Sequence, residues 1–200
     1  NKRMGLNSAA ARLKSYTFRQ GSIKTTVTMP PSDGNRIQVR LSEDGTLPAG
    51  NSAAVHIYNS AGTYEYRLYV NNVQQGASVV STCTSVQLAD ILIERDTDHG
   101  VWYIYCWNAS TESQPVTPTF KLITSGYQEV YWGAATSGLV YVTDISIRAE
   151  SIVGRTNVEV TEPFWFRDEF REDSRGRYAT PGTERYDGEN NEYYVGGRSG

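Results

Sequence analysis

Apolar and polar residues alternate with a period of two along most of the chain, which is typical of strands with one buried face. The runs with the clearest alternation are Ile37–Leu41, Tyr64–Val70, Val101–Trp107 and Val140–Ile147. Turn-forming residues separate these runs, as at Pro30–Asn35 and Asn59–Gly62. Asn71–Asn72 has the composition of a tight hairpin turn, because Asn tolerates positive φ. The pattern predicts an all-β fold of about nine to eleven short strands, an antiparallel β-sandwich.

One segment departs from this pattern. Leu6–Ser15 contains Ala9, Ala10, Ala11 and Leu13, a composition that favours helix over strand. We therefore expect residues 1–15 to form a short N-terminal helix or arm. Residues 16–150 are expected to form the sandwich.

The charge pattern changes towards the C-terminus. Residues 162–200 hold six Arg, no Lys and nine Asp or Glu, whereas the remainder of the chain is neutral. An aromatic cluster also falls here, at Phe164–Phe166 and Phe170. A shift in composition predicts a boundary, so we interpret 151–161 as a linker. Residues 162–200 are then the start of a second β domain or a docking arm.

Composition excludes some classes of protein. The 200 residues have a formal charge of −3 and no basic stripe, which argues against nucleic acid as a partner. No run of 18 apolar residues exists, so we expect no membrane insertion. Residues 1–15 lack the apolar segment of a secretory signal, and the first residue is Asn1, which suggests a fragment of a longer polypeptide or a processed chain.

The two cysteines, Cys83 and Cys106, are too few for a zinc site or a disulfide framework. Cys106 lies in an apolar and aromatic run, which favours a buried free thiol. A disulfide between the two is the alternative, if their strands are neighbours.

Motifs for catalysis are absent from the sequence. No phosphate-binding loop, nucleophile elbow or zinc-protease motif occurs. The two histidines are interpreted as a strand residue, His56, and a turn residue, His99. Glu94 and Asp96 share a strand face but lie where the strand runs into a turn, so we interpret them as solvated acids. We expect no enzymatic activity.

Acidic turns raise the alternative of a calcium site. Asp96 and Asp98 resemble the first half of a D-x-D loop, although the remaining oxygen ligands are missing from the sequence. The loop Asp187–Glu192 has more oxygen ligands at short range. No other cofactor is implied.

Aromatic residues offer a candidate ligand site. Alternation places Trp102, Ile104 and Cys106 on one strand face, which we interpret as core. The opposite face and a later strand supply the candidate residues, which are Tyr103, Tyr105, Trp107, Tyr131 and Trp132. Tyr and Trp stack on the C–H faces of sugar rings, so these residues could bind a glycan. Alternatively, another strand, a loop or a second subunit covers them.

A family resemblance rests on the order of these strands. The matching segments are Phe18–Ser22, Val86–Asp90, Ile93–Asp96, Tyr103–Asn108, Gly126–Gly133 and Val140–Ile147. Residues 16–147, about two-thirds of the chain, resemble the concanavalin A-like (laminin G-like) jelly-roll domains of phage minor tail and tail-fibre proteins. Asp168–Ser174 is similar to the D-x-F-x-x-x-D motif with which a new domain often begins in such proteins.

The resemblance implies a non-enzymatic virion protein. Such a module lies on the phage tail or tail fibre, outside the cell, and takes part in attachment to host-surface glycan or in tail architecture. Its implied partners are other virion tail subunits and copies of itself, a trimer being one form. The E-x-D-x-x-E strand of glycosidases in this family is absent here. The alternatives are a carbohydrate-binding module of a bacterial enzyme and, third, a divergent sandwich glycosidase.

Overall fold

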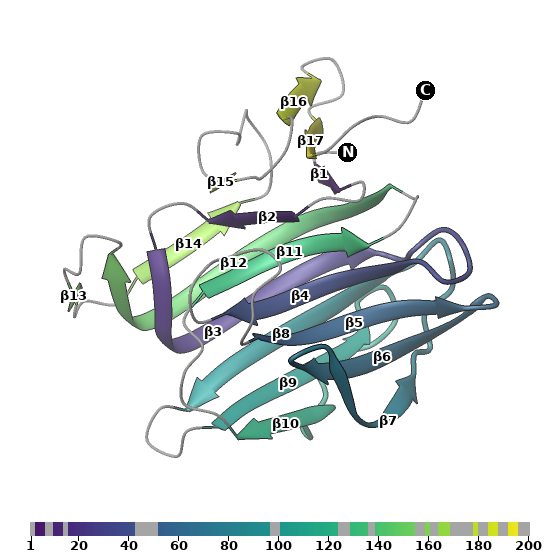
Figure 1. The fold of residues 1–200 in the computed structure, drawn as a ribbon, viewed down its shortest axis with the longest axis horizontal. Helices are drawn as coiled ribbons and strands as arrows, with labels where there is room; N and C mark the ends of the chain where they lie inside the picture. Colours follow the sequence, from purple (N-terminus) through teal and green to yellow (C-terminus); the bar gives the residue numbers. More distant parts are fainter. Residues whose placement is uncertain are drawn as a thin grey trace.

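Two β-sheets, named sheet A and sheet B, contain all the regular structure in the described part of the chain (Figure 1). The computed structural model describes residues 3–6, 10–13, 16–42, 52–96, 101–123, 129–135, 139–154, 159–160, 164–168, 178–179, 184–187 and 192–195. Within these ranges there is no helix, and hence none that could cross a membrane. The predicted antiparallel β-sandwich is confirmed.

Sheet A has ten strands. Its main path is β10 (Phe120–Ile123), β9 (Val101–Asn108), β8 (Leu88–Asp96), β3 (Tyr16–Thr28), β12 (Val140–Gly154), β1 (Arg3–Leu6), β17 (Glu192–Val195) and β16 (Glu184–Asp187). β13 (Glu159–Val160) and β14 (Phe164–Asp168) also pair with β12. All neighbours are antiparallel except β1 and β17, which are parallel.

Sheet B has seven strands, all antiparallel to their neighbours. Their order is β15 (Tyr178–Ala179), β2 (Ala10–Leu13), β11 (Glu129–Ala135), β4 (Arg36–Ser42), β5 (Ser52–Ser60), β6 (Thr63–Val70) and β7 (Val73–Val80). β5, β6 and β7 follow one another as hairpins, and the turn of the second is Asn71–Asn72 with φ values of 49° and 65°. The predicted tight turn at these two asparagines is confirmed.

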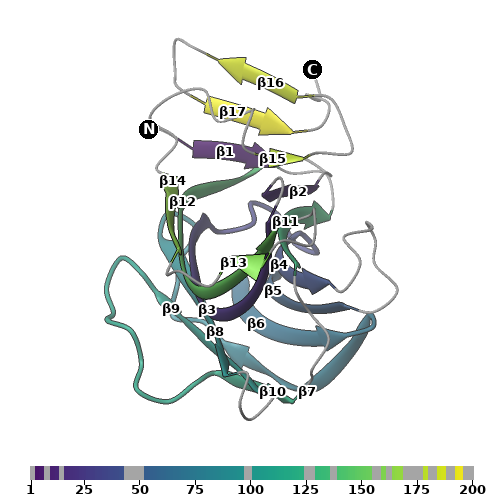
Figure 2. The ribbon, with the colours of Figure 1, turned by 90° about the vertical axis from the view of Figure 1, so that its left-hand side faces the viewer.

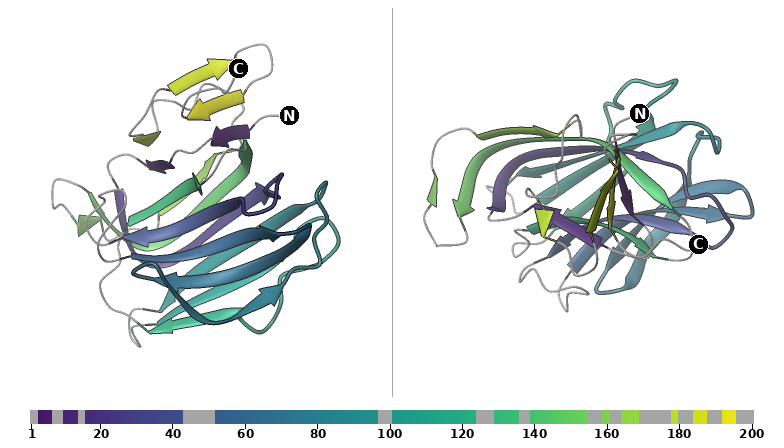
Figure 3. Two further views of the ribbon diagram at one scale, coloured as in Figure 1. Left: turned by 45° about the vertical axis from the view of Figure 1, so that its right-hand side comes forward. Right: turned by 90° about the horizontal axis from the view of Figure 1, so that it is seen from above.

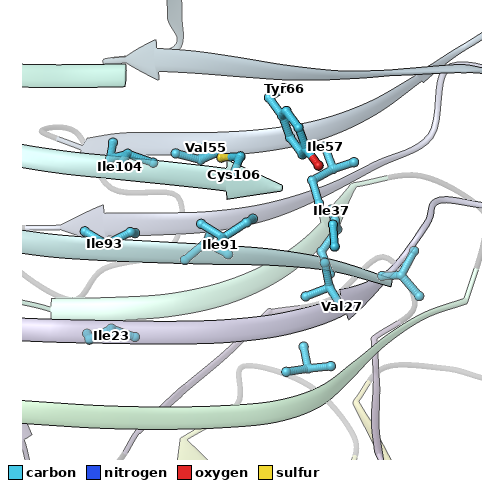
Figure 4. Packing of buried hydrophobic residues seen from close by; sticks show 14 of the residues in the cluster. Ile23, Val27, Ile37, Val55, Ile57, Tyr66, Ile91, Ile93, Ile104 and Cys106 are labelled. Carbon is cyan, nitrogen blue, oxygen red and sulfur yellow. The ribbon is translucent and has the colours of Figure 1, made fainter. Parts of the chain in front are cut away.

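The core lies between the sheets, and alternate residues of the central strands supply it. Sheet A contributes Ile23, Ile91, Ile93 and Ile104, and sheet B contributes Ile37, Val55, Ile57 and Tyr66 (Figure 4). Trp102, Ile104 and Cys106 all belong to this cluster, which confirms the predicted inward face of β9. Each fully buried aliphatic side chain of this kind stabilises the fold by about 1.5–3 kcal/mol relative to exposure.

The N-terminal segment is not helical where the structure describes it. Leu6 ends β1, and Ala10–Leu13 form β2, so the predicted helix over residues 6–15 is wrong at these positions. β1 pairs with β12, and β2 pairs with β11. Met4 and Leu6 are 0% exposed, so burial in the sandwich outweighs the helical propensity of the neighbouring alanines.

C-terminal strands join both sheets. β14 pairs with β12, β15 with β2, and β17 with β1. β1, β17 and β16 lie together at one end of the molecule (Figures 2 and 3). The division at 151–161 remains a prediction, but β14, β15 and β17 each pair with a strand from the first 154 residues, and β16 pairs with β17.

Both cysteines are buried free thiols, as interpreted for Cys106, and the alternative of a disulfide does not hold. The Cys83 Sγ lies 3.8 Å from the Tyr66 hydroxyl oxygen. That hydroxyl also accepts a hydrogen bond from Ser81 Oγ (2.9 Å). Burial raises the pKa of the Tyr66 phenol and of both thiols well above their ordinary values. These groups are therefore neutral members of the core at physiological pH.

Candidate functional site

The outer face of β9 carries three aromatic residues, Tyr103, Tyr105 and Trp107, which we call the β9 row. They alternate with Trp102, Ile104 and Cys106, whose side chains point into the core. A strand rises by about 3.3 Å per residue, so neighbours in the row stand about 6.6 Å apart along the strand. β8 supplies one flank of the row and β10 the other.

Trp107 is the buried member of the row, with only 5% of the residue exposed. The Lys24 Nζ lies 5.4 Å from the centroid of its ring. The same ammonium group forms an ion pair with Asp90 (Nζ–Oδ2 2.6 Å), and the Thr26 hydroxyl donates a hydrogen bond to that carboxylate. The Trp107 ring thus packs near the ammonium group of Lys24. The Lys24 side chain stays 39% exposed.

Tyr103 and Tyr105 are only half-buried and form the accessible part of the row. The Lys121 Nζ lies 5.4 Å from the centroid of the Tyr103 ring. Burial raises the pKa of Tyr105, and the charge of Glu94 and a hydrogen bond to Glu94 raise it further. The Tyr105 phenol therefore stays protonated at neutral pH and can donate a hydrogen bond.

The arrangement is suited to a ligand that has both apolar faces and hydroxyl groups. Two tyrosine rings offer flat apolar surface, while Lys121 and Glu94 supply a donor and an acceptor beside them. Pyranose rings have the complementary surface, with C–H groups on their faces and hydroxyls at their edges.

The other two predicted aromatic residues are in the opposite sheet. Tyr131 and Trp132 belong to β11, where they pair with Arg40 and Val39 of β4. Their side chains lie outside the described part of the structure. The structure therefore places the five predicted residues in two sheets, with three of them in one row.

The predicted calcium ligands fall largely outside the described residues. Asp96 is the last residue of β8, where it pairs with Val101, and its side chain is not described. Asp98, His99 and the loop 188–191 are not described at all. In the described ranges, no three His, Cys, Asp or Glu side chains gather as a metal site would require.

His56 is buried in β5, where the sequence predicts a strand residue. Only 4% of it is exposed, and its ring stacks on Tyr69 of β6 with centroids 4.2 Å apart and an interplanar angle of 23°. The ring is thus an ordered part of the outer layer of sheet B.

A charged network that was not predicted from the sequence lies beside His56. The Arg67 Nε and Nη2 donate hydrogen bonds of 2.9 and 2.7 Å to the Glu65 carboxylate. The same guanidinium lies 3.9 Å from the centroid of the Tyr58 ring. Glu65 and Arg67 carry opposite charges at alternate positions of β6, and alternation places both side chains on one face of the strand. This pattern in the sequence could have predicted the ion pair.

A loop at one end of the sandwich is held by hydrogen bonds of polar side chains, of which Asn108 is buried. Asn108 is 1% exposed, and its side-chain amide donates to Gln87 Oε1 (3.0 Å). The Glu112 carboxylate accepts hydrogen bonds from the Asn108 backbone N–H (3.1 Å) and from Thr82 Oγ1 (2.6 Å). These bonds connect the segment after β7 to the one after β9, next to the Trp107 end of the row.

Comparisons with known proteins find structural likeness at low identity. No family model matches the chain, and no curated protein does. Among solved structures, lectin II from Ulex europaeus is 10% identical over 69% of this chain and 75% of that chain, with a TM-score of 0.42.

Two further solved structures are similar to a comparable degree. The carbohydrate binding module CBM66 from Bacillus subtilis is 11% identical over 68% of this chain and 81% of that chain, with a TM-score of 0.45. A native glycosidic hydrolase is 9% identical over 69% and 76%, also with a TM-score of 0.45.

Proposed function

We propose that this chain is a non-enzymatic glycan-binding module, exposed on a phage tail or tail fibre, that takes part in attachment to the host surface. The main evidence for this proposal is the set of side chains on the outer face of β9. There Tyr103 and Tyr105 remain accessible, with Lys121 and Glu94 beside them. The neighbouring Lys24, placed by Trp107 and Asp90, supplies a further donor.

Binding is the role that suits these polar groups. The Asp90 carboxylate is 6% exposed and engaged by Lys24 and Thr26, so it orients a cation. The Glu94 carboxylate is hydrogen-bonded to Tyr105. A pair of acids that cleaves a glycoside must instead reach the scissile bond from two sides.

The virion part of the proposal is supported by the sequence resemblance described above. Under it, the partners are other tail subunits and copies of this chain, and the module works outside the cell. Host-surface polysaccharides are the glycans that such a module would meet.

The test is a glycan array and a host-cell pull-down with the 200-residue chain and three variants. Tyr105→Ala and Tyr103→Ala remove the accessible rings, and Tyr141→Ala is the matched control. Tyr141 is also half-buried, but it lies in β12 under the Arg3 guanidinium (3.5 Å from the ring centroid). We expect the row variants to bind a recognised glycan about tenfold more weakly, as for a lost aromatic contact, and the control to bind normally.

Three outcomes count against the proposal. Absence of any glycan signal overturns glycan binding. Unchanged binding by both row variants overturns the β9 site. Binding to a polysaccharide without capture of cells overturns the role in attachment and favours a carbohydrate-binding module of an enzyme.

A further inference from the structure

The strand β7 ends sheet B, and it differs from the other strands that have a single neighbour in the described part of the chain (Figure 1). Of those others, β10 and β16 have four residues each, β14 has five, and all three contain charged residues. β13 and β15 have two residues each. Shortness and charge are the means by which natural proteins keep a sheet edge from pairing with another chain. β7 has eight residues, and none of them is charged or a proline.

The lack of charge extends beyond β7 on both sides. Residues 68–89 contain no Asp, Glu, Lys or Arg, although 20% of the whole chain is charged. When a strand pairs antiparallel with its own copy across a two-fold axis, a charge close to the axis meets the identical charge of the copy, which is unfavourable. A segment without charges avoids this repulsion. In its charge, β7 is therefore complementary to itself.

β7 also exposes apolar side chains at the margin of the sandwich. The register places Val73 opposite Val70 and Val79 opposite the buried Tyr66, so both valines point to the side of the core. Val73 is nonetheless 63% exposed and Val79 40% exposed. A strand from a second copy beside β7 would remove much of this apolar surface from water, which is favourable.

The middle of β7 is a bulge that contains a glycine. Pairing with β6 passes from Gln75, opposite Leu68, to Val79, opposite Tyr66, and Gly76 has a φ of 70°. In the described part of the structure, nothing beyond the adjacent residues lies within 4 Å of the place that a Cβ of Gly76 would take. A glycine within a strand often marks a point where another backbone approaches closely. Gly76 is therefore the position of β7 best suited to lie on a two-fold axis.

We propose that β7 pairs with the β7 strand of a second copy of this chain, antiparallel across a two-fold axis at Gly76. In this register Val73 of each copy lies opposite Val79 of the other, and the two B sheets form one continuous sheet. The inference rests on the part of the proposed function in which copies of this chain are partners. It does not depend on glycan binding by the β9 row, which lies in the other sheet.

The experiment is sedimentation velocity of the 200-residue chain over concentrations from about 1 to 300 μM. One strand edge is a small contact compared with the roughly 1,200–2,000 Å² of a stable interface, so we expect a dimer with a Kd of about 10–100 μM. A monomer at every concentration, or a trimer, overturns the proposal.

Variants locate the contact. Val79→Lys is expected to weaken the dimer at least about tenfold, because an ammonium group would lie within the contact. Val116→Lys introduces the same charge at a 98% exposed position in the loop between β9 and β10, and it should leave the dimer unchanged. A dimer that Val79→Lys does not affect, or that both variants weaken equally, overturns the assignment to β7. Val73→Lys, at the more exposed valine, makes the same test if Val79→Lys does not fold.

A double variant tests the register. Val73→Glu combined with Val79→Lys would place opposite charges across the axis twice in each dimer. We expect association to recover at least about threefold relative to Val79→Lys alone, and the recovered part to weaken as salt rises. No recovery overturns the axis at Gly76. A dimer without any glycan signal counts against glycan binding alone, and glycan binding by a strict monomer counts against the β7 contact alone.

Discussion

Lys24 and Asp90 form an ion pair between β3 and β8, on the outer face of sheet A. The register pairs Thr26 with Asp90 and Lys24 with Leu92, so the ion pair is diagonal. The Lys24 Nζ and Asp90 Oδ2 atoms are 2.6 Å apart, and the two side chains are 39% and 6% exposed. One partner is therefore buried, and the other is partly in solvent beside the β9 row.

This asymmetry predicts unequal effects of removing each partner. Lys24→Met leaves a buried carboxylate without its cation, so we expect the free energy of unfolding to fall by about 2 kcal/mol. Asp90→Asn leaves the partly exposed ammonium in contact with water and is expected to cost about 1 kcal/mol. A double-mutant cycle by urea denaturation measures the coupling. Additive effects of the two substitutions would contradict a direct interaction.

Stability is predicted to decrease at alkaline pH. Burial raises the pKa of Cys106 and of Tyr66 in the folded protein, whereas the unfolded chain loses these protons near pH ~8.5 and ~10. Above those values the unfolded state binds fewer protons than the native state. Stability is therefore complete below pH ~8.5 and then falls by about 1.4 kcal/mol per pH unit for each group. Urea denaturation from about pH 7 to 10.5 measures the slope.

Two variants assign this pH dependence. Cys106→Ala should reduce the part that begins near pH ~8.5, to which the buried Cys83 also contributes, and Tyr66→Phe should reduce the part that begins near pH ~10, to which Tyr105 also contributes. A wild-type stability that stays constant over the whole range would show that the groups are not buried as described.

The turn between β6 and β7 predicts different effects of Ala and Gly. Asn72 has a φ of 65°, which costs about 1 kcal/mol for a residue with an ordinary Cβ and almost nothing for Gly. Asn72→Ala should therefore lower the free energy of unfolding by about 1 kcal/mol, and Asn72→Gly should change it less. Thermal unfolding of the pair measures the difference. A more stable Ala variant would contradict the turn geometry.

The buried amide of Asn108 predicts a role in fixing the loop after β9. Its Nδ2 donates to Gln87, and its Oδ1 accepts from the backbone N–H of Ser110 (3.0 Å). Asn108→Ala removes both hydrogen bonds of this buried amide, so we expect a loss of about 2 kcal/mol. Thr117→Ala, at an exposed position of the same loop, is the control and should change stability by less than about 0.5 kcal/mol. Equal effects in denaturation experiments would contradict the anchoring role.

Local patterns predicted most of the strands and several faces. Alternation in Val101–Trp107 was sufficient to assign Trp102, Ile104 and Cys106 to the core, since successive side chains of a strand point to opposite sides. Two consecutive asparagines between apolar runs were sufficient to predict the turn at 71–72. Such features depend only on neighbours in the sequence.

The N-terminal segment and the exposure of the β9 row depended on partners that are distant in the sequence. Alanine-rich residues 10–13 form a strand because β11, more than 100 residues later, pairs with them. Alternation assigned Trp107 to the outer face, but Lys24 and Asp90 on two other strands decided how it is packed there. The sequence by itself determined the class of fold and the sidedness of its strands, because these follow from the period of the pattern. Only the tertiary structure decided which aromatic rings stay accessible, because burial is set by side chains that the fold brings together.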